Sequence, residues 1–247
     1  MEDAVAIGEQ TGGLSEIERV VDTFVAPAAT FRDILRSASW WLPFVLLVAS
    51  SLATAFVVDR KVGFDQVFEN QVRQSQKAQD RLADLTPGQR AQNVKIQVTV
   101  TKYITYGSFA MIAIFLAIYS LILWAAFNFG LGAKTTFPQV FAVSMYSALP
   151  YLLTALLTIL ALWFGGNAEG YDYKNPVGTN LGYFLPDAAP WLKGLLSSFD
   201  VVKLWSVVLQ AVGMAIIAKK TIAQSAIIVG VFWLIGVMAT VAGAAFS

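Results

Sequence analysis

The segment Tyr103–Ala133 reads YITYGSFAMIAIFLAIYSLILWAAFNFGLGA, and none of its 31 residues is Lys, Arg, Asp or Glu. A helix needs about 20 apolar residues to cross about 30 Å of hydrocarbon. Four more stretches without a charged residue follow the same pattern: Trp40–Val58, Thr135–Ala168, Leu204–Ala218 and Thr221–Ser247. The sequence therefore predicts an all-α, polytopic membrane protein with five transmembrane helices, at about 40–58, 103–131, 137–164, 201–218 and 221–245.

The composition removes most of the chemistry that an enzyme could use. Hydrophobic residues make up 57% of the chain and charged residues 13%, where a soluble domain carries about 25% charged residues. The net charge of +1 argues against a nucleic-acid partner. The absence of His and Cys excludes disulfides, thiolate nucleophiles and the usual transition-metal ligands. We therefore predict no enzyme activity, no catalytic residue, no metal site and no cofactor.

Residues 1–13 are expected to form a flexible tail, and residues 14–39 amphipathic surface helices. The sequence from Ser15 to Glu18 has the spacing of a capping box, which starts a helix. One face of this helix is apolar and the other polar, with Leu14, Ile17, Val20, Val21 and Phe24 on the first and Glu16, Glu18, Arg19 and Asp22 on the second. The helix is therefore expected to lie on the membrane surface or, alternatively, to pack against another cytosolic element. The pair Trp40-Trp41 is typical of an interfacial anchor at the start of the first span.

The largest polar segment lies between the first two spans, and we expect a helical hairpin over residues 62–102. Thr86-Pro87-Gly88-Gln89 supplies an N-cap, a first-turn proline and a capping glutamine, after which nothing stops the helix before Gly130. The second arm of the hairpin should thus be continuous with the second span and project roughly 24 Å. This hairpin is either a surface that binds a partner or a solvated spacer.

The third and fourth spans carry the polar and helix-breaking residues that are candidates for a functional or packing role. Pro150 removes the hydrogen bond to the Tyr146 carbonyl and should bend the third span, with Ser147 and Thr154 helping to satisfy the freed group. The run from Trp191 to Phe199 is expected to form a helix at the interface. The turn at Lys219-Lys220 is short enough to make spans four and five an antiparallel hairpin.

Asp200 and Lys203 lie three residues apart at the start of the fourth span, at interface depth, and could pair there as a structural anchor or serve a substrate or proton. Gln210, near the middle of the same span, is expected to tie helices together. In the fifth span, small residues that include Gly236 and Gly243 would allow close packing, either within the bundle or between two copies of the chain.

Three motifs, taken in order, resemble the Ypt-interacting-protein (Yip) domain family of five-span membrane proteins, especially its bacterial branch. They are Pro27-Ala28-Ala29-Thr30-Phe31-Arg32-Asp33-Ile34 with Trp41-Leu42-Pro43, then Gly132 with Phe137-Pro138-Gln139-Val140-Phe141-Ala142-Val143-Ser144-Met145-Tyr146-Ser147-Ala148-Leu149-Pro150, then Phe199-Asp200-Val201-Val202-Lys203-Leu204-Trp205 with Gly213. The resemblance covers roughly residues 20–245. It implies a five-span architecture, and small-GTPase binding only by analogy with the eukaryotic trafficking members, whose first loop is more compact.

Two functions remain open at this point. The first is a non-catalytic scaffold or membrane-organising component that engages lipids, a protein partner or a second copy of the chain. The second is a transporter or an accessory subunit of one, although the sequence shows no inverted repeat and no pair of broken helices.

The orientation in the membrane is predicted from competing signals. Six Lys and Arg residues lie on the side of the N-terminus and eleven on the opposite side, a count that favours an external N-terminus. The family resemblance, the Arg32/Arg36 pair and the Lys219-Lys220 turn favour a cytoplasmic one. We expect the N-terminus in the cytoplasm and the C-terminus outside, in the inner (cytoplasmic) membrane if the protein is bacterial.

Overall fold

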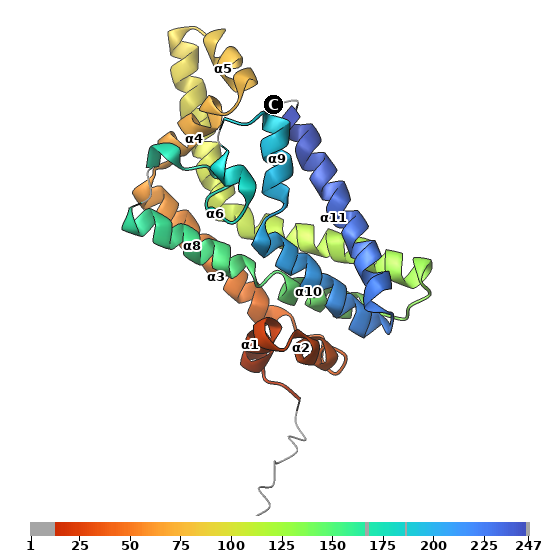
Figure 1. Ribbon diagram of the computed structural model, residues 1–247. Coiled ribbons are helices and arrows are strands. Elements are labelled where there is room, and N and C mark those ends of the chain that lie inside the picture. Colours follow the sequence, from red (N-terminus) through yellow and green to blue (C-terminus); the bar gives the residue numbers. More distant parts are fainter. Residues whose placement is uncertain (1–12, 166–167, 186, 246–247) are drawn as a thin grey trace, which may run out of the picture.

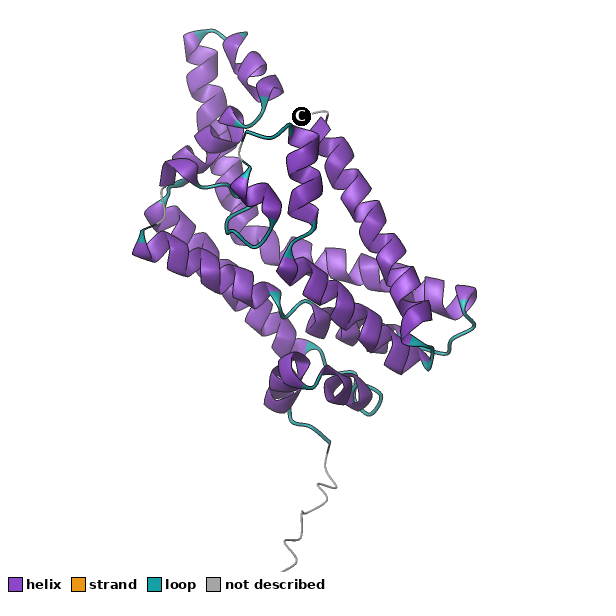
Figure 2. Cartoon of the chain, viewed as in Figure 1, coloured by secondary structure: helices purple, strands orange, loops and turns teal. Residues whose placement is uncertain are grey.

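The computed structural model describes residues 13–165, 168–185 and 187–245, and these residues form helices and connecting loops without a strand (Figures 1 and 2). Within this part of the chain, five helical segments are long and apolar enough to cross a membrane: Trp41–Lys61, Pro87–Gly130, Phe137–Phe164, Val201–Ala218 and Ile222–Ala245. The prediction of an all-α protein with five transmembrane helices is confirmed.

Two short helices, α1 (Glu16–Val25) and α2 (Pro27–Asp33), precede the first span, α3 (Trp41–Lys61). The predicted capping box is present, because Ser15 Oγ accepts from the Glu18 N–H at 3.2 Å and the Glu18 carboxylate accepts from the Ser15 N–H at 2.7 Å. Helix α2 packs on the fourth span at Gly213, where an added Cβ would lie 3.0 Å from the Phe31 ring. This contact leaves no room for a larger residue at position 213.

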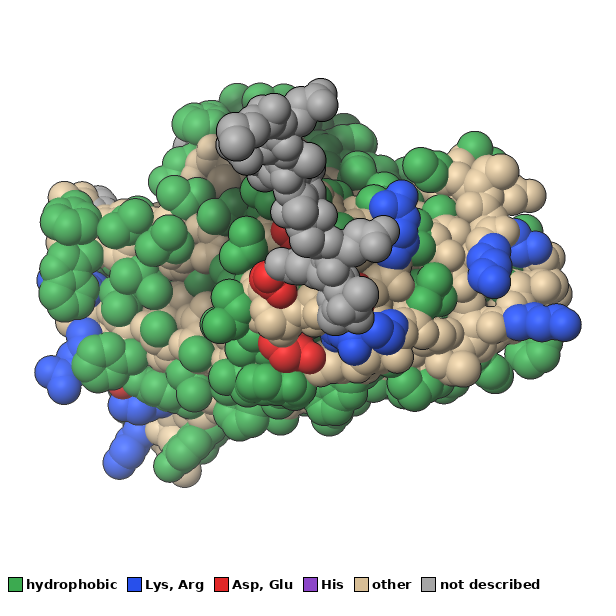
Figure 3. Space-filling view, turned by 90° about the horizontal axis from the view of Figure 1, so that it is seen from below, with side chains coloured by type: hydrophobic (Ala, Val, Ile, Leu, Met, Phe, Trp, Pro, Cys, Tyr) green, Lys and Arg blue, Asp and Glu red, His purple; other side chains and the backbone are tan. Residues whose placement is uncertain are grey.

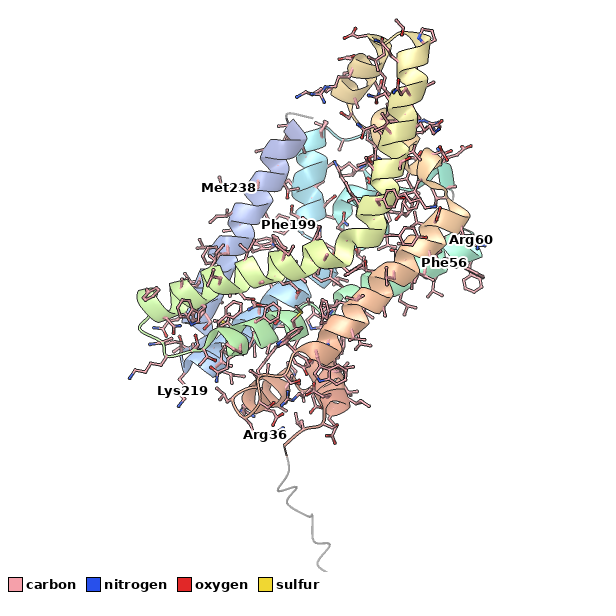
Figure 4. The ribbon with its side chains drawn as sticks, turned by 180° about the vertical axis from the view of Figure 1, so that it is seen from behind. Arg36, Phe56, Arg60, Phe199, Lys219 and Met238 are labelled. Atoms are coloured by element: carbon pink, nitrogen blue, oxygen red, sulfur yellow. The ribbon has the colours of Figure 1, made fainter. Side chains whose placement is uncertain are left out.

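The segment between the first two spans forms α4 (Phe64–Arg73), α5 (Gln76–Ala83) and the first turns of α6 (Pro87–Ala125). The first arm is divided into two helices, since the hydroxyl of Ser75 caps α5 by accepting from the Ala78 N–H. Helix α6 begins at the predicted Thr86/Gln89 capping box and runs without interruption into the membrane. It stands off the bundle, then changes direction and crosses in front of the other helices in the view of Figure 4. It ends in one turn of π-helix, Ala126–Gly130.

The remaining helices are α7 (Phe137–Ser147), α8 (Tyr151–Phe164), α9 (Pro190–Ser198), α10 (Val201–Ala218) and α11 (Ile222–Ala245), with 3₁₀ turns at Ala168–Gly170 and Leu181–Phe184. The main core lies where α2, α6, α7 and α10 meet, around the fully buried Phe31, Phe127 and Met214. Arg36, before the first span, and Lys219, after α10, lie at the same end of the molecule (Figure 4). The α4–α5 pair lies at the opposite end (Figure 1).

Candidate binding cavity between two broken spans

The third span is broken at Pro150 into α7 and α8. The Tyr146 carbonyl, which would normally accept from residue 150, instead accepts from the Leu149 N–H at 3.1 Å. The Ser147 carbonyl accepts from the Ser206 hydroxyl of α10. A proline in a membrane helix frees backbone carbonyls that need other partners. Here a tighter turn and the neighbouring span supply the hydrogen-bond donors for these carbonyls. The Ser147 hydroxyl, expected to help, has no partner in the described part of the chain.

A second helix break lies at Phe199-Asp200, between α9 and the fourth span, α10. Helix α9 packs along the second half of α11: a Cβ added at Gly194 would lie 3.2 Å from that of Ala244, and the Phe199 and Trp233 rings meet edge to face at 5.3 Å. Figure 1 shows α9 beside α11. Helix α9 thus packs lengthwise along α11, and its expected place at the membrane interface stays a prediction.

Asp200 holds the second break together as the N-cap of α10. Its carboxylate is 6% exposed and accepts from the N–H groups of Val202 and Lys203, at 2.9 and 3.1 Å. Its second oxygen accepts from the Thr179 hydroxyl and from Asn180 Nδ2 at 3.2 Å. Four donors on one buried carboxylate anchor the 175–180 loop to the start of α10.

The predicted ion pair between Asp200 and Lys203 does not form. The Lys203 ammonium donates to the Ser197 carbonyl at 3.0 Å, in the last turn of α9, where a cation meets the negative end of a helix dipole. The two residues contact each other only through the Lys203 backbone N–H. Lys203 therefore bridges the break from α10 back to α9.

The two breaks lie at the same depth. Helix α10 runs antiparallel to the third span, with Gly213 beside Val143, Ser206 beside Ser147, and Asp200 lining the same small cavity as Tyr151. Helix α8 then continues to Phe164, about 20 Å beyond this level at 1.5 Å per residue. Asp200 is thus beside the middle of the third span, and its expected position at the membrane interface stays a prediction.

The 168–185 segment packs near the start of α10, and side chains from α4 and α9 hold it in place. Asn70 of α4 donates to the carbonyls of Ala168 and Tyr171, at 3.0 and 2.9 Å. Lys193 of α9 pairs with Asp172 at 3.1 Å. These contacts fix a polar segment against the bundle, where its tyrosines face the transmembrane helices.

A cavity of about 440 Å³ lies between α3, α6, α8 and this segment. Its sixteen described lining residues include no Lys, Arg, Asp or Glu, and ten of them carry a hydroxyl: Ser50, Ser51, Thr54, Thr105, Ser108, Tyr151, Thr154, Thr158, Tyr171 and Tyr173. A second cavity of about 70 Å³ adjoins it, shares Tyr151 and Thr154 with it, and is bounded by Asp200 and Lys203. The volume of the larger cavity falls within the roughly 300–1,000 Å³ typical of ligand sites.

The spacing of Ser, Thr and Tyr residues along two spans could have predicted this cavity, although no single residue indicates it. Ser50, Ser51 and Thr54 recur at three- and four-residue spacing on α3, and Tyr151, Thr154 and Thr158 do so on α8. Such spacing places hydroxyls on one face of each helix. Two hydroxyl faces in otherwise apolar spans indicate a shared polar environment, and the structure brings them together.

Three other predicted residues have clear positions. Gln210 is 4% exposed, and its Nε2 has no partner among the described residues, so its role in tying helices together stays a prediction. A Cβ added at Gly236 or Gly243 would meet nothing within 4 Å in the described chain. These two glycines therefore make no close helix contact within the described bundle.

Tyr146, the remaining candidate, joins the N-terminal helices to the third span. Its hydroxyl donates to Glu16 at 3.1 Å. Arg19, only 1% exposed, pairs with Asp33 at 2.6 Å and lies 3.6 Å from Glu16. Sequence spacing had placed Arg19 on the outward polar face of α1. Its burial follows from a tertiary partner on α2, which local periodicity does not reveal.

The docking of α1 and α2 should weaken in acid. The hydrogen bond from Arg36 is the largest cause that lowers the pKa of Asp33 from its ordinary value of 3.8. A carboxylate with a lowered pKa stabilises the fold fully above its unfolded pKa, and this contribution disappears as the pH falls through the folded value. The hydrogen-exchange protection factors of residues 16–33 should be steady from pH 8 to about 5 and fall below about 4. An Asp33→Asn variant should lose this dependence.

The chain was also compared with known proteins. The model of the Yip1 domain matches residues 21–243. No curated protein and no solved structure matches the chain. The match spans all five transmembrane segments and both breaks, so it covers the whole membrane-embedded architecture. The chain belongs to the Yip1 domain family and is an integral membrane protein.

Proposed function

We propose that this protein is a non-catalytic membrane scaffold that engages a protein partner through the part of α6 that stands off the bundle. The observation that carries the proposal is an exposed apolar stripe, which we name the α6 stripe. It consists of Ile96 and Val100, which precede the predicted second span, and of Tyr103 and Ile104 at its start, and these are 52%, 43%, 75% and 61% exposed. These positions follow the i, i+4, i+7, i+8 pattern of one helix face. A face of this kind suits an amphipathic helix of a partner.

The charges around the α6 stripe suggest the chemistry of that partner. Arg90 and Lys95 are exposed on the same helix, whereas Lys102 is already paired with Asp59 at 3.0 Å. A partner with an apolar face and an acidic rim would complement this surface. A second copy of the chain and the surrounding lipids are the other expected contacts, and small-GTPase binding rests on family analogy alone.

We further propose a cytoplasmic N-terminus and an external C-terminus, in the cell membrane if the protein is bacterial. Helices α1 and α2 and the turns at Lys134 and Lys219-Lys220 would then lie on the cytoplasmic side. The α6 stripe would lie on the external side of the membrane. In the view from the α1–α2 end, hydrophobic side chains dominate the outline and the charged ones form small groups (Figure 3). A reporter fused after Ser247 tests this orientation: activity of a cytosolic reporter there would reverse it.

The scaffold proposal predicts that a charge in the α6 stripe removes the partner. The double variant Ile96→Glu/Val100→Glu should reduce recovery of specific partners at least about tenfold in quantitative affinity purification from native membranes, since each buried anchor contributes about 1–2 kcal/mol. The control is Gln97→Glu, an exposed neighbour on an adjacent face. Equal recovery with the wild type and both variants would refute the proposal.

Transport is the second candidate function, and the two breaks at one depth favour it, because discontinuous helices often surround a midplane site. A transporter should give substrate-dependent flux in liposomes that Thr154→Val or Asp200→Asn reduces while the protein stays folded. Flux that is unchanged in both variants would refute the transport hypothesis.

A further inference from the structure

We infer that the 440 Å³ cavity binds an uncharged amphiphile that carries hydroxyl or ester groups, such as a glyceride or a long-chain alcohol. Nothing in this inference depends on the α6 stripe, which lies on the part of α6 that precedes the cavity. Three features of the cavity carry it: its depth in the membrane, its hydrogen-bonding groups and its lack of charge.

The depth of the cavity gives access from the bilayer. Its walls come from the middle of α3 (positions 47–58), from the first half of α8 (positions 151–158) and from α6 near Ser108. All three segments belong to helices long and apolar enough to span the membrane. A ligand dissolved in the bilayer is therefore at the right level to enter, whereas a purely aqueous solute must first cross the 168–185 segment.

The lining offers both acceptors and donors. The Thr54 and Thr158 hydroxyls donate to backbone carbonyls of their own helices, at 2.9 and 2.7 Å, and so keep their oxygen lone pairs available as acceptors. Burial raises the pKa of the Tyr171 phenol, which therefore stays protonated and able to donate. An amphiphile would form hydrogen bonds with these hydroxyls and place its chain against Leu47, Val58 and Ile112.

The charge pattern selects against ions. No described lining residue of the larger cavity is charged, and a buried charge without a partner is expensive. The nearest buried carboxylate, Asp200, already accepts from four donors. The Lys203 ammonium is engaged by the Ser197 carbonyl. Lys174 lines the smaller cavity, so an anionic ligand drawn to it is the main competing outcome.

The test compares ligands that share one chain and differ in charge. The full-length protein in nanodiscs is titrated with monooleoylglycerol, oleate and oleylamine, and with glycerol to represent an aqueous source, and binding is read by native mass spectrometry. Monooleoylglycerol should bind at least about tenfold more tightly than either charged ligand, because one unpaired buried charge costs more than the 1.4 kcal/mol that corresponds to tenfold. Tighter binding of oleate or oleylamine, or of glycerol alone, would overturn the proposal.

Matched variants separate the cavity from surrounding lipid. The double variant Thr54→Val/Thr154→Val removes two lining hydroxyls and should weaken monooleoylglycerol binding about tenfold. The control Thr240→Val removes a hydroxyl that makes the same kind of bond, to Gly236 at 2.9 Å, on the exposed side of α11. Filling the cavity with Ala155→Phe should abolish binding, whereas Ala226→Phe on α11 should not. Thermal unfolding checks that each variant is folded, and equal binding by lining and control variants would show annular lipid only.

Discussion

Replacing Arg19 by methionine should cost about 3–5 kcal/mol and release α1 and α2 from the bundle. The guanidinium is 1% exposed and lies between Asp33 at 2.6 Å and Glu16 at 3.6 Å. The substitution removes the buried one of the two cations that pair with Asp33 and leaves that carboxylate only the exposed Arg36, and the loss of a partner from a buried ion pair is strongly destabilising. Because Glu16 also accepts from Tyr146, the loss should spread to the contact between α1 and the third span. Thermal unfolding and hydrogen exchange of residues 16–33 measure both effects.

Arg36 provides the control for this prediction. It also pairs with Asp33, at 2.8 Å, but its side chain is 53% exposed. Exposed pairs contribute about 0–1 kcal/mol, so Arg36→Met should change the unfolding temperature little. If the two variants destabilise the protein equally, the burial of Arg19 is not what holds these helices in place.

Replacing Asp200 by alanine should cost about 2–4 kcal/mol and loosen the 175–180 loop. The helix loses its N-cap, which is typically worth about 1 kcal/mol, and the buried Asn180 amide loses an acceptor, which costs about 1–3 kcal/mol. The Thr179 hydroxyl loses its acceptor as well. Hydrogen exchange should increase in residues 175–180 and in the first turn of α10, and monooleoylglycerol binding should fall because the wall of the cavity is displaced.

Two further variants locate the cause of that loss. Asp200→Asn retains an oxygen for the N-cap, so it should recover about half of the stability. Asp22→Ala removes a partly exposed acidic side chain of α1 and should have no measurable effect on residues 175–180. An Asp200→Ala protein with unchanged exchange in residues 175–180 would contradict the assigned anchoring role.

Local sequence signals predicted the fold well. Charge-free stretches located the five spans, because lipid excludes unpaired charge regardless of the neighbouring helices. The capping boxes at Ser15 and Thr86 fixed the starts of α1 and α6, since each depends on residues only three apart. Pro150 located the break in the third span for the same reason, although the partners of the freed carbonyls came from elsewhere in the fold.

The site depended on contacts that local patterns do not encode. The segment that becomes α9 is short and contains Lys193, so its sequence indicated an interfacial helix and did not reveal that it packs along α11. Arg19 looked solvent-exposed because its partner Asp33 lies fourteen residues away on another helix. On α1 itself, Ile17 and Val21 of the predicted apolar face remain 72% and 53% exposed; their contact with the membrane surface stays a prediction.

The most direct test of the central claim, a hydroxyl-lined cavity beside the break in the third span, is thiol accessibility. The chain has no cysteine, so Thr54→Cys, Thr154→Cys and Thr240→Cys can each be introduced singly and treated with an uncharged, water-soluble methanethiosulfonate reagent. Reaction requires a thiolate and hence water. The first two positions should react quickly and be protected by monooleoylglycerol, and Thr240→Cys, on the exposed side of α11, should react slowly. Equal, slow reaction at all three positions would contradict a hydrated cavity.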